Sequence, residues 1–277
     1  MLNLKIMVTF LLASSLVISG SAVGQTDSST KKRSSVPAGD QRPLVGIHDI
    51  QLADGVSESD FDTFVKGPLA ELWENPIGGI QLRVYKGDRG AANGKYRLAW
   101  EFESVACRNR YFPSDSEVAQ AFQDDVQSKL TDVQTKFDSM FSRTAFTDFV
   151  ILFATDPVAD TDARSLYGVH DIALLPGVSA ETFESFVTGP YAQAWKSPIG
   201  GIGHMVMKGD RGEETGQYKL VYRFTPASLR DEYIPQPTRI SDVFRDEIMP
   251  KMPQDLQEKF STMVEDKGFT DYAPIGK

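Results

Sequence analysis

The sequence repeats itself, and this repeat constrains the fold more than any other feature. Three motifs recur in the same order: Gly-Ile-His-Asp-Ile at 46–50 as Gly-Val-His-Asp-Ile at 168–172, Pro-Ile-Gly-Gly-Ile at 76–80 and 198–202, and Lys-Gly-Asp-Arg-Gly at 86–90 and 208–212. A unit of about 110 residues is long enough to bury a core of its own. The sequence therefore predicts a duplicated domain, with one copy at 44–154 and a second at 164–277.

The N-terminal residues have the features of an export signal. An apolar run at 6–18 follows Lys5 and precedes the small-residue sequence Ala22-Val23-Gly24. This pattern predicts a signal peptide at 1–24, followed by a disordered linker at 25–43 that is rich in Ser, Thr and Lys. The apolar run is shorter than the roughly 20 residues that span a bilayer. We therefore expect a periplasmic or extracellular protein with no membrane insertion after cleavage; an uncleaved anchor is the alternative.

Charge and cysteine content exclude several classes of partner and crosslink. The formal net charge of −9 argues against binding to nucleic acid or to an anionic membrane surface. The single cysteine, Cys107, cannot form an intramolecular disulfide. It aligns with Leu229 of the second copy, which favours a buried apolar role over a reactive thiol.

Each copy has the pattern β-α-β-β-α-β. The third strand of the pattern alternates apolar and polar residues at 96–102 and 218–224, and a Gly-Pro pair at 67–68 and at 189–190 is expected to break or kink the first helix. The second helix is expected to be long, with an apolar stripe from Val118 to Phe141 in the first copy. This order is the ferredoxin-like arrangement of the α+β class. It predicts two tandem ferredoxin-like copies whose bare sheet faces meet in one intramolecular pseudo-dimeric α/β barrel.

The sequence resembles one known superfamily. The stretch Leu-Ala-Asp-Gly-Val-Ser at 52–57 is similar to the strand-turn-helix entry of the stress-responsive branch of the dimeric α/β-barrel superfamily. The β-α-β-β-α-β order of both copies agrees with this resemblance. The superfamily includes cofactor-free monooxygenases, haem-handling enzymes, lyases and binding proteins, so the resemblance implies a fold and leaves the function open.

The three histidines are the first candidates for a functional site. His48 and His170 occupy equivalent places on the first strand of each copy, and His204 lies on the second strand of the second copy. They could contact a ligand, act as a base or hold a haem; the alternative is a hydrogen-bonded histidine in the core. Neighbouring strand residues point to opposite faces, which excludes a dyad of His48 with Asp49. The sequence shows no spacing typical of a metal site, and it identifies no cofactor.

The charged residues on the opposite face of these strands suggest a polar barrel interior. If the row that contains His48 faces the helices, the other row faces the lumen, with Asp49, Arg97 and Glu101 from one copy and Asp171, Lys219 and Arg223 from the other. Buried charges must be paired. Because Glu101 occupies the position that Arg223 has in the second copy, we expect the two to lock the halves together; a polar ligand pocket is the alternative.

Four further residues are candidate ligand contacts. Arg89 and Arg211, in the Lys-Gly-Asp-Arg-Gly motif, could present a guanidinium to a carboxylate or phosphate, or could pair with the adjacent aspartate to shape the turn. Tyr111 and Tyr233 lie in the loops before the second helix, where they could contact a ligand or pack locally.

These features lead to one function hypothesis and two alternatives. The leading hypothesis is an exported protein that binds a small apolar or aromatic molecule in a cavity of each half. An enzyme of the monooxygenase, isomerase or haem-related type, with a histidine as base or axial ligand, is the first alternative. A protein-interaction module without a ligand is the second.

Overall fold

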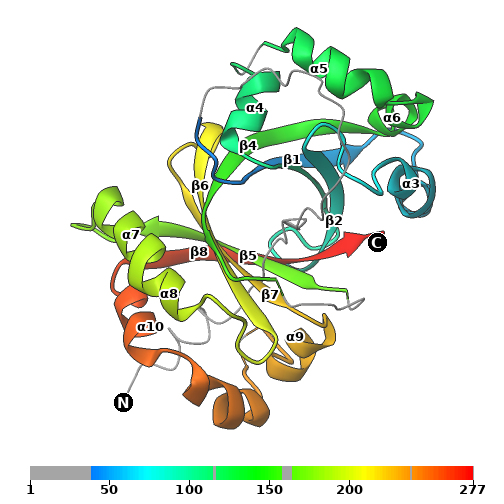
Figure 1. Ribbon diagram of the computed structural model, residues 1–277. Coiled ribbons are helices and arrows are strands. Elements are labelled where there is room, and N and C mark those ends of the chain that lie inside the picture. The colour runs from blue at the N-terminus through cyan, green and yellow to red at the C-terminus, as the bar shows by residue number, and fades with distance from the viewer. Residues whose placement is uncertain (1–38, 115–116, 158–163, 238, 277) are drawn as a thin grey trace, which may run out of the picture.

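The computed structural model describes residues 39–114, 117–157, 164–237 and 239–276 (Figure 1). The expected signal peptide at 1–24 and most of the expected linker lie outside these residues. Within the described part of the chain, no helix is both long and apolar enough to cross a membrane.

Eight antiparallel strands form a single closed barrel in the order β1-β3-β2-β8-β5-β7-β6-β4 (Figure 1). We call β1 to β4 with their helices the first half, and β5 to β8 with theirs the second half. The strands span β1 Leu44–Leu52, β2 Ile80–Gly90, β3 Tyr96–Phe102, β4 Phe141–Ala154, β5 Leu166–Leu174, β6 Ile202–Gly212, β7 Tyr218–Phe224 and β8 Val264–Ile275.

The expectation of two ferredoxin-like copies that pack their bare sheet faces together is wrong. The halves meet edge to edge and share one continuous sheet, because β2 hydrogen-bonds to β8 and β4 hydrogen-bonds to β6. The reason lies in the length of β4 and β8. The first part of β4 pairs with β1 and its last part, from Thr147 to Ala154, reaches across to β6. An unpaired strand edge leaves backbone donors and acceptors without partners, and closure removes every such edge.

Short helices cover the outside of the barrel, where Figure 1 shows those of the first half on one side and those of the second half on the other. The α-helices are α2 Glu58–Phe64, α3 Ala70–Leu72, α4 Val105–Tyr111, α5 Gln120–Asp125, α6 Asp132–Asp138, α7 Ala180–Phe186, α8 Ala192–Ala194, α9 Ser228–Tyr233 and α10 Gln254–Ser261. The expected break at the Gly-Pro pairs is present as a π-helical turn, Val65–Leu69 in the first half and Val187–Tyr191 in the second. Proline cannot donate to the helical ladder, so the ladder shifts at this point.

The long second helix expected in the first half is not continuous. Its apolar stripe is divided among α5, a 3₁₀ turn at Gln127–Lys129, and α6, and Phe141 already belongs to β4. Thr131 ends the interruption by capping α6, because its hydroxyl accepts a hydrogen bond from the backbone N–H of Val133. The break places residues of the segment between α5 and α6 on the outer side of the sheet, where they line a cavity described below.

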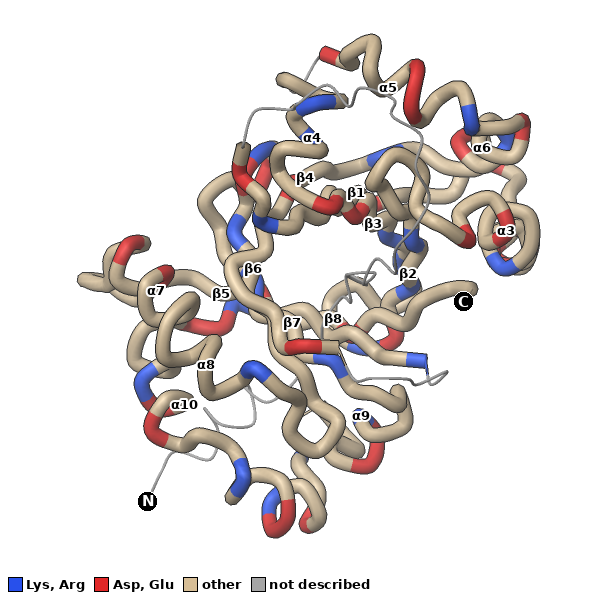
Figure 2. Tube along the Cα trace, viewed as in Figure 1, with Lys and Arg blue, Asp and Glu red and all other residues tan. Residues whose placement is uncertain are grey.

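The alternation left open which of the two rows on each strand lines the lumen, and the structure decides it. Val45, Ile47 and Tyr85 contribute to an apolar cluster inside the barrel, and Glu101, Lys219 and Arg223 are buried there. Figure 2 shows charged residues on the barrel strands as well as on the outer helices. The opposite row, which includes His48, faces the helices.

The lumen charges pair mostly within their own half. The carboxylate of Glu101 accepts from Arg83 at 2.8 Å, that of Asp49 from Arg97 at 2.6 Å, and that of Asp171 from Lys219 at 2.6 Å. Among the described residues, Glu101 forms no ion pair with Arg223, so the expected lock between them is not formed.

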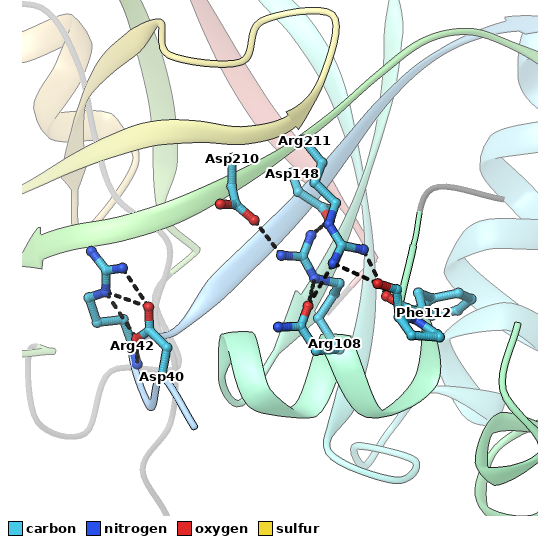
Figure 3. Close-up of polar contacts among 9 residues, drawn as sticks. Asp40, Arg42, Arg108, Phe112, Asp148, Asp210 and Arg211 are labelled. Carbon is cyan, nitrogen blue, oxygen red and sulfur yellow. Dashed lines mark hydrogen bonds and ion pairs between the residues drawn. The ribbon is translucent and has the colours of Figure 1, made fainter. Parts of the chain in front are cut away.

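Instead, ion pairs on the outer face join the halves, and the Lys-Gly-Asp-Arg-Gly motif provides them. Arg108 on α4 is 2% exposed and binds both Asp148 on β4 and Asp210 of the other half (Figure 3). The second half repeats the arrangement: Arg230 on α9 binds Asp271 on β8 and Asp88 of the first half. The aspartate of each motif therefore reaches across the junction rather than shaping its own turn.

Each of these junctions is completed by the arginine of the same motif. Arg89 donates to the carboxylate of Asp271 at 3.0 Å and to the carbonyl of Ile234 at 3.1 Å. Arg211 donates to the carbonyl of Phe112 at 2.7 Å (Figure 3). The first glycine of the motif is required because a Cβ atom at Gly87 would lie 1.9 Å from the carbonyl oxygen of Ala92 across the hairpin.

We expect the junction carboxylates to contribute strongly to stability. Asp271 is fully buried between Arg89 and Arg230. Asp271→Asn keeps the shape but removes the buried charge, which leaves Arg230 with only the more exposed carboxylates of Asp88 and Asp231, so we expect the free energy of unfolding to fall by about 3 kcal/mol. Urea denaturation measures this change.

The control is Glu265→Gln on the same strand, which removes an exposed ion pair with Lys267. Exposed pairs contribute about 0–1 kcal/mol, so this variant is expected to unfold close to the wild-type midpoint. Equal destabilisation by the two substitutions would show that the junction ion pairs have no special role.

Candidate functional site

A cavity of about 570 Å³ lies in the first half, between the outer face of the barrel and the helices α4, α5 and α6. Its volume falls within the range typical of small-molecule sites, roughly 300–1,000 Å³. Its lining consists of aromatic, polar and charged side chains, one leucine and one glycine: Gly46, His48, Trp100, Phe102, Arg108, Phe112, Ser114, Phe122, Gln127, Leu130, Thr131, Asp132, Gln134, Thr135, Asp138, Arg143, Phe146, Asp148 and Arg211. The interruption between α5 and α6 supplies one wall.

His48 is the polar group at the floor of this cavity. It lies on β1, is half-buried, and stacks on Phe146 of β4 with ring centroids 4.7 Å apart. Its Nδ1 atom is buried and has no hydrogen-bond partner among the described residues. Burial, reinforced by the positive charge of Arg143, lowers the pKa of His48 to about 4. The imidazole is therefore neutral at physiological pH, and the His48 side chain forms part of the cavity lining.

Aromatic side chains form a large part of the cavity walls. Trp100 on β3 packs edge-on against Trp73 at 5.5 Å, and the indole N–H of Trp73 donates to Gln134 at 3.0 Å. On the helical side, the rings of Phe112 and Phe122 are 5.0 Å apart. Trp100, Phe112 and Phe122 are all only partly buried, because one side of each ring faces the cavity. Such walls favour a flat, apolar ligand.

Charges of both signs border the cavity in equal number. Arg143 lies 3.2 Å from Asp138 in a half-exposed ion pair, and Arg108 is bound to buried Asp148. Burial raises the pKa of Asp148, although Arg108 acts in the opposite direction. Arg211 and Asp132 complete the charged lining. The balance of three arginines and three aspartates gives the cavity no strong preference for one sign of charge.

The second half uses the equivalent residues differently. His170 is 1% exposed, and its Nδ1 lies 2.6 Å from the carboxylate of Asp266. The strand register places Asp266 where the first half has Arg143, since Ile50 pairs with Arg143 and Ile172 pairs with Asp266. The histidine of the second half is therefore held by an internal carboxylate, whereas His48 faces the cavity.

The aromatic positions show the same difference between the halves. The counterparts of Trp100, Phe112 and Phe122 are fully buried in the core of the second half: Tyr222, Ile234 and Phe244. These side chains pack against one another over the sheet. The expectation of a ligand cavity in each half is thus met by the structure in the first half only, as far as the described residues show.

His204 lies in the core of the second half. It stacks on Trp195 with ring centroids 3.6 Å apart, and its Nδ1 lies 2.7 Å from the hydroxyl of Tyr191. Burial lowers its pKa well below the ordinary value. It replaces Leu82 of the first half as a filling residue, and the described cavity in the first half does not include it.

The two candidate tyrosines have matching positions outside any described cavity. The hydroxyl of Tyr111 donates to the carbonyl of Gly78 at 2.7 Å, and that of Tyr233 donates to the carbonyl of Gly200 at 3.0 Å. Both bonds fasten the helix to the Gly-Gly turn before β2 or β6. Of the two candidate arginines, Arg211 lines the cavity and Arg89 lies at the opposite junction.

The sequence singled out His48 and Arg211 but not the aromatic wall or Arg143. One signal was available: the copies differ beside their equivalent histidines, with Arg143 in one and Asp266 in the other. The described residues contain no group of three or more His, Cys, Asp or Glu side chains that could hold a metal ion.

No protein-family model and no curated protein matches the sequence. Solved structures of similar shape include an anthrone oxidase-like protein, with 12% identity and a TM-score of 0.45 over 85% of this chain and 92% of that one. A monooxygenase-like protein of Fusobacterium nucleatum has 9% identity and a TM-score of 0.48 over 84% and 93%. A chlorite dismutase variant of Candidatus Nitrospira defluvii has 9% identity and a TM-score of 0.42 over 87% and 94%. Likeness at this level does not place the chain in a family.

Proposed function

We propose that the protein binds a small, flat, mainly aromatic molecule in the cavity of the first half. The observation that carries this proposal is His48, whose ring lines a cavity with aromatic walls and whose buried Nδ1 has no hydrogen-bond partner among the described residues. Native proteins leave few buried polar atoms without a partner, and such atoms mark places where a ligand or water completes the structure. The second half supports the proposal, because there the equivalent nitrogen is bound by Asp266 and the aromatic side chains are packed together.

The low pKa of His48 agrees better with a role in ligand binding than with a role in proton transfer. A general base works best when its pKa is close to the working pH, and the pKa of His48 is about 4. A neutral imidazole in an apolar cavity accepts or donates a hydrogen bond and orients a ligand without changing its own charge. The bordering ion pairs then fix the shape of the site.

An enzyme that holds a haem is the second candidate, and the neutral imidazole of His48 favours it. A neutral imidazole is a ligand that haem iron takes, and a cavity of about 570 Å³ with His48, Trp100 and Phe146 in its lining has the size that a porphyrin needs. His48 would hold the group, and the haem would supply redox chemistry when bound. The chain's own contribution would be an apolar pocket that limits the access of water.

A blocked cavity tests the binding proposal. Thr135 is exposed on α6 and lines the cavity, so Thr135→Trp fills the site without disturbing the core. Anilinonaphthalene sulfonate, a flat aromatic probe, becomes fluorescent in apolar sites. We expect Thr135→Trp to weaken its binding at least roughly tenfold, which corresponds to about 1.4 kcal/mol.

The matched control is Glu258→Trp, which places the same side chain at the equivalent position on α10. This variant is expected to bind the probe as the wild type does. If the probe fails to bind the wild type, or if both variants bind equally well, the cavity is not the site.

The low pKa of His48 gives a pH profile. Between about pH 5.5 and about pH 8 the imidazole stays neutral, so the affinity for the probe is expected to be constant over this range. The ordinary pKa of histidine is about 6.5. A transition in affinity near that pH, absent from His48→Gln, would show that His48 titrates like an exposed histidine and is not buried at the floor of the site.

Titration with hemin separates the two candidates. If the site holds haem, the absorption spectrum of the wild type shifts to that of a histidine-ligated haem at one equivalent, and His48→Ala abolishes this shift. His170→Ala is the control, because its ring is bound to Asp266. A spectrum that stays that of free hemin in the wild type excludes the haem candidate and leaves the binding proposal intact.

A further inference from the structure

We propose that Arg211 is a positioning residue of the ligand site, and that ligand binding and closure of the barrel at the β4–β6 junction support each other. This inference rests on the proposed function and adds to it a contribution from the second half. Arg211 lies on β6 and lines the cavity that the helices of the first half cover. It acts through the segment after α4, which carries one aromatic wall of the cavity.

The segment after α4 receives hydrogen bonds from Arg211. Helix α4 ends at Tyr111, and carbonyl groups at the end of a helix have no donor within it. The Nη1 atom of Arg211 donates to the carbonyl of Phe112 at 2.7 Å, and its Nη2 atom donates to that of Pro113 at 3.3 Å. Figure 3 shows the side chain of Arg211 directed at Phe112. One charged donor from the second half thus fixes the backbone of two successive residues of the first half.

The ring of Phe112 needs this support more than its counterpart in the second half does. Its centroid lies 5.0 Å from that of Phe122 and 6.2 Å from that of Phe102, but the side chain is only partly buried because it borders the cavity. The counterpart, Ile234, is fully buried in a packed core. A side chain beside a cavity lacks packing contacts on that side. The position of Phe112 therefore depends more strongly on the hydrogen bonds of its backbone.

The same arginine connects this wall to the junction ion pairs. Its Nη2 atom also donates to the side-chain oxygen of Asn109 at 2.9 Å, and this oxygen accepts from the Nε atom of Arg108 at 2.8 Å. Arg108 in turn binds the carboxylates of Asp148 and Asp210 across the junction. A ligand that binds only when Phe112 is in place therefore favours the arrangement in which this network is intact. By thermodynamic linkage, the intact junction raises the affinity for the ligand by the same factor.

Arg89 provides a matched comparison, because the repeat places it at the equivalent position of the opposite junction. It donates to the carbonyl of Ile234 at 3.1 Å, a bond that corresponds to the one from Arg211 to Phe112. The layer around Ile234 is filled, and Arg89 is not part of the cavity lining. We therefore expect Arg211→Met and Arg89→Met to lower the melting temperature by similar amounts but to differ in their effect on ligand binding.

Fluorescence titration with two probes, well below the melting temperature, tests the proposal. Anilinonaphthalene sulfonate carries a negative charge, and N-phenylnaphthylamine is the same aromatic molecule without the sulfonate. We expect Arg211→Met to weaken the binding of both probes roughly tenfold, the effect of losing a charge-assisted hydrogen bond that holds the wall. Arg89→Met is expected to keep both affinities near those of the wild type. Arg211→Lys, which retains one charged donor, is expected to recover part of the affinity.

The alternative outcomes count against the proposal in different ways. Weaker binding of the sulfonate alone would mean that Arg211 contacts the charge of the probe and does not position the wall. An equal loss of affinity in Arg211→Met and Arg89→Met would mean a general loss of stability. If Thr135→Trp loses affinity and Arg211→Met does not, the cavity is the site but Arg211 does not position it. A wild type that binds neither probe would overturn the proposed function as well.

Amide hydrogen exchange on the wild type covers the case in which Arg211→Met does not fold. The backbone N–H of Glu213 donates to the carbonyl of Phe146 at 3.0 Å across the β4–β6 junction, and that of Ala91 donates to the carbonyl of Phe269 at 3.1 Å across the β2–β8 junction. Saturating N-phenylnaphthylamine is expected to slow exchange at Glu213 more than at Ala91, because a ligand suppresses the openings that its binding excludes. Equal slowing at the two junctions, or none at Glu213, would overturn the proposal.

Discussion

The architecture depends on the paired carboxylates that bind arginines across the two junctions of the barrel. Asp148 and Asp271 are buried where the long strands β4 and β8 leave their own half. Each carboxylate holds an arginine from the first short helix after the third strand of its half, Arg108 or Arg230, and that arginine also binds the aspartate of the other half's glycine-rich motif. Main-chain pairing closes the barrel, and these ion pairs fix the register at which it closes.

This constraint leaves the outer faces free to differ. Both halves keep the same junction, but the first half has an open layer between sheet and helices, whereas the second half fills it with Tyr222, Ile234 and Phe244. The residues beside the histidines differ in the same way. Next to Arg143, the Nδ1 of His48 has no hydrogen-bond partner among the described residues, whereas Asp266 binds His170. The second half thus contributes to closing the barrel, and the first half also carries the candidate site. A duplicated barrel permits this difference because closure requires both halves, whereas the open layer lies in the first.

The sequence predicted the strands and their faces because apolar alternation is a local property. The alternation placed His48 in one row and Asp49 with Glu101 in the other, but it left open which row faces the helices. The structure places His48 on the helix side and buries Glu101 in the lumen. The prediction of how the halves join was wrong, because the pairing of β4 with β6 at the sheet edge is a long-range contact that alternation does not encode. The predicted partner of Glu101, Arg223, was wrong for a similar reason. Glu101 instead binds Arg83, a neighbour across the β2–β3 ladder. The cavity could not be predicted from the pattern. It lies where α5 and α6 are separated, and the place of Arg143 beside His48 depends on a register shift between β1 and β4.

The pairing of β2 with β8 also has a consequence for the order of folding. Arg89 and Asp271, which meet at this junction, are separated by 182 residues. During synthesis the first half exposes the edge of β4 until β6 has been made, and the edge of β2 until β8, the last strand of the barrel, has been made. Contacts of such separation form slowly, and exposed edges invite pairing with other chains in the meantime. The newly made chain therefore passes through a stage in which such edges are open to other chains, and the closed barrel removes them.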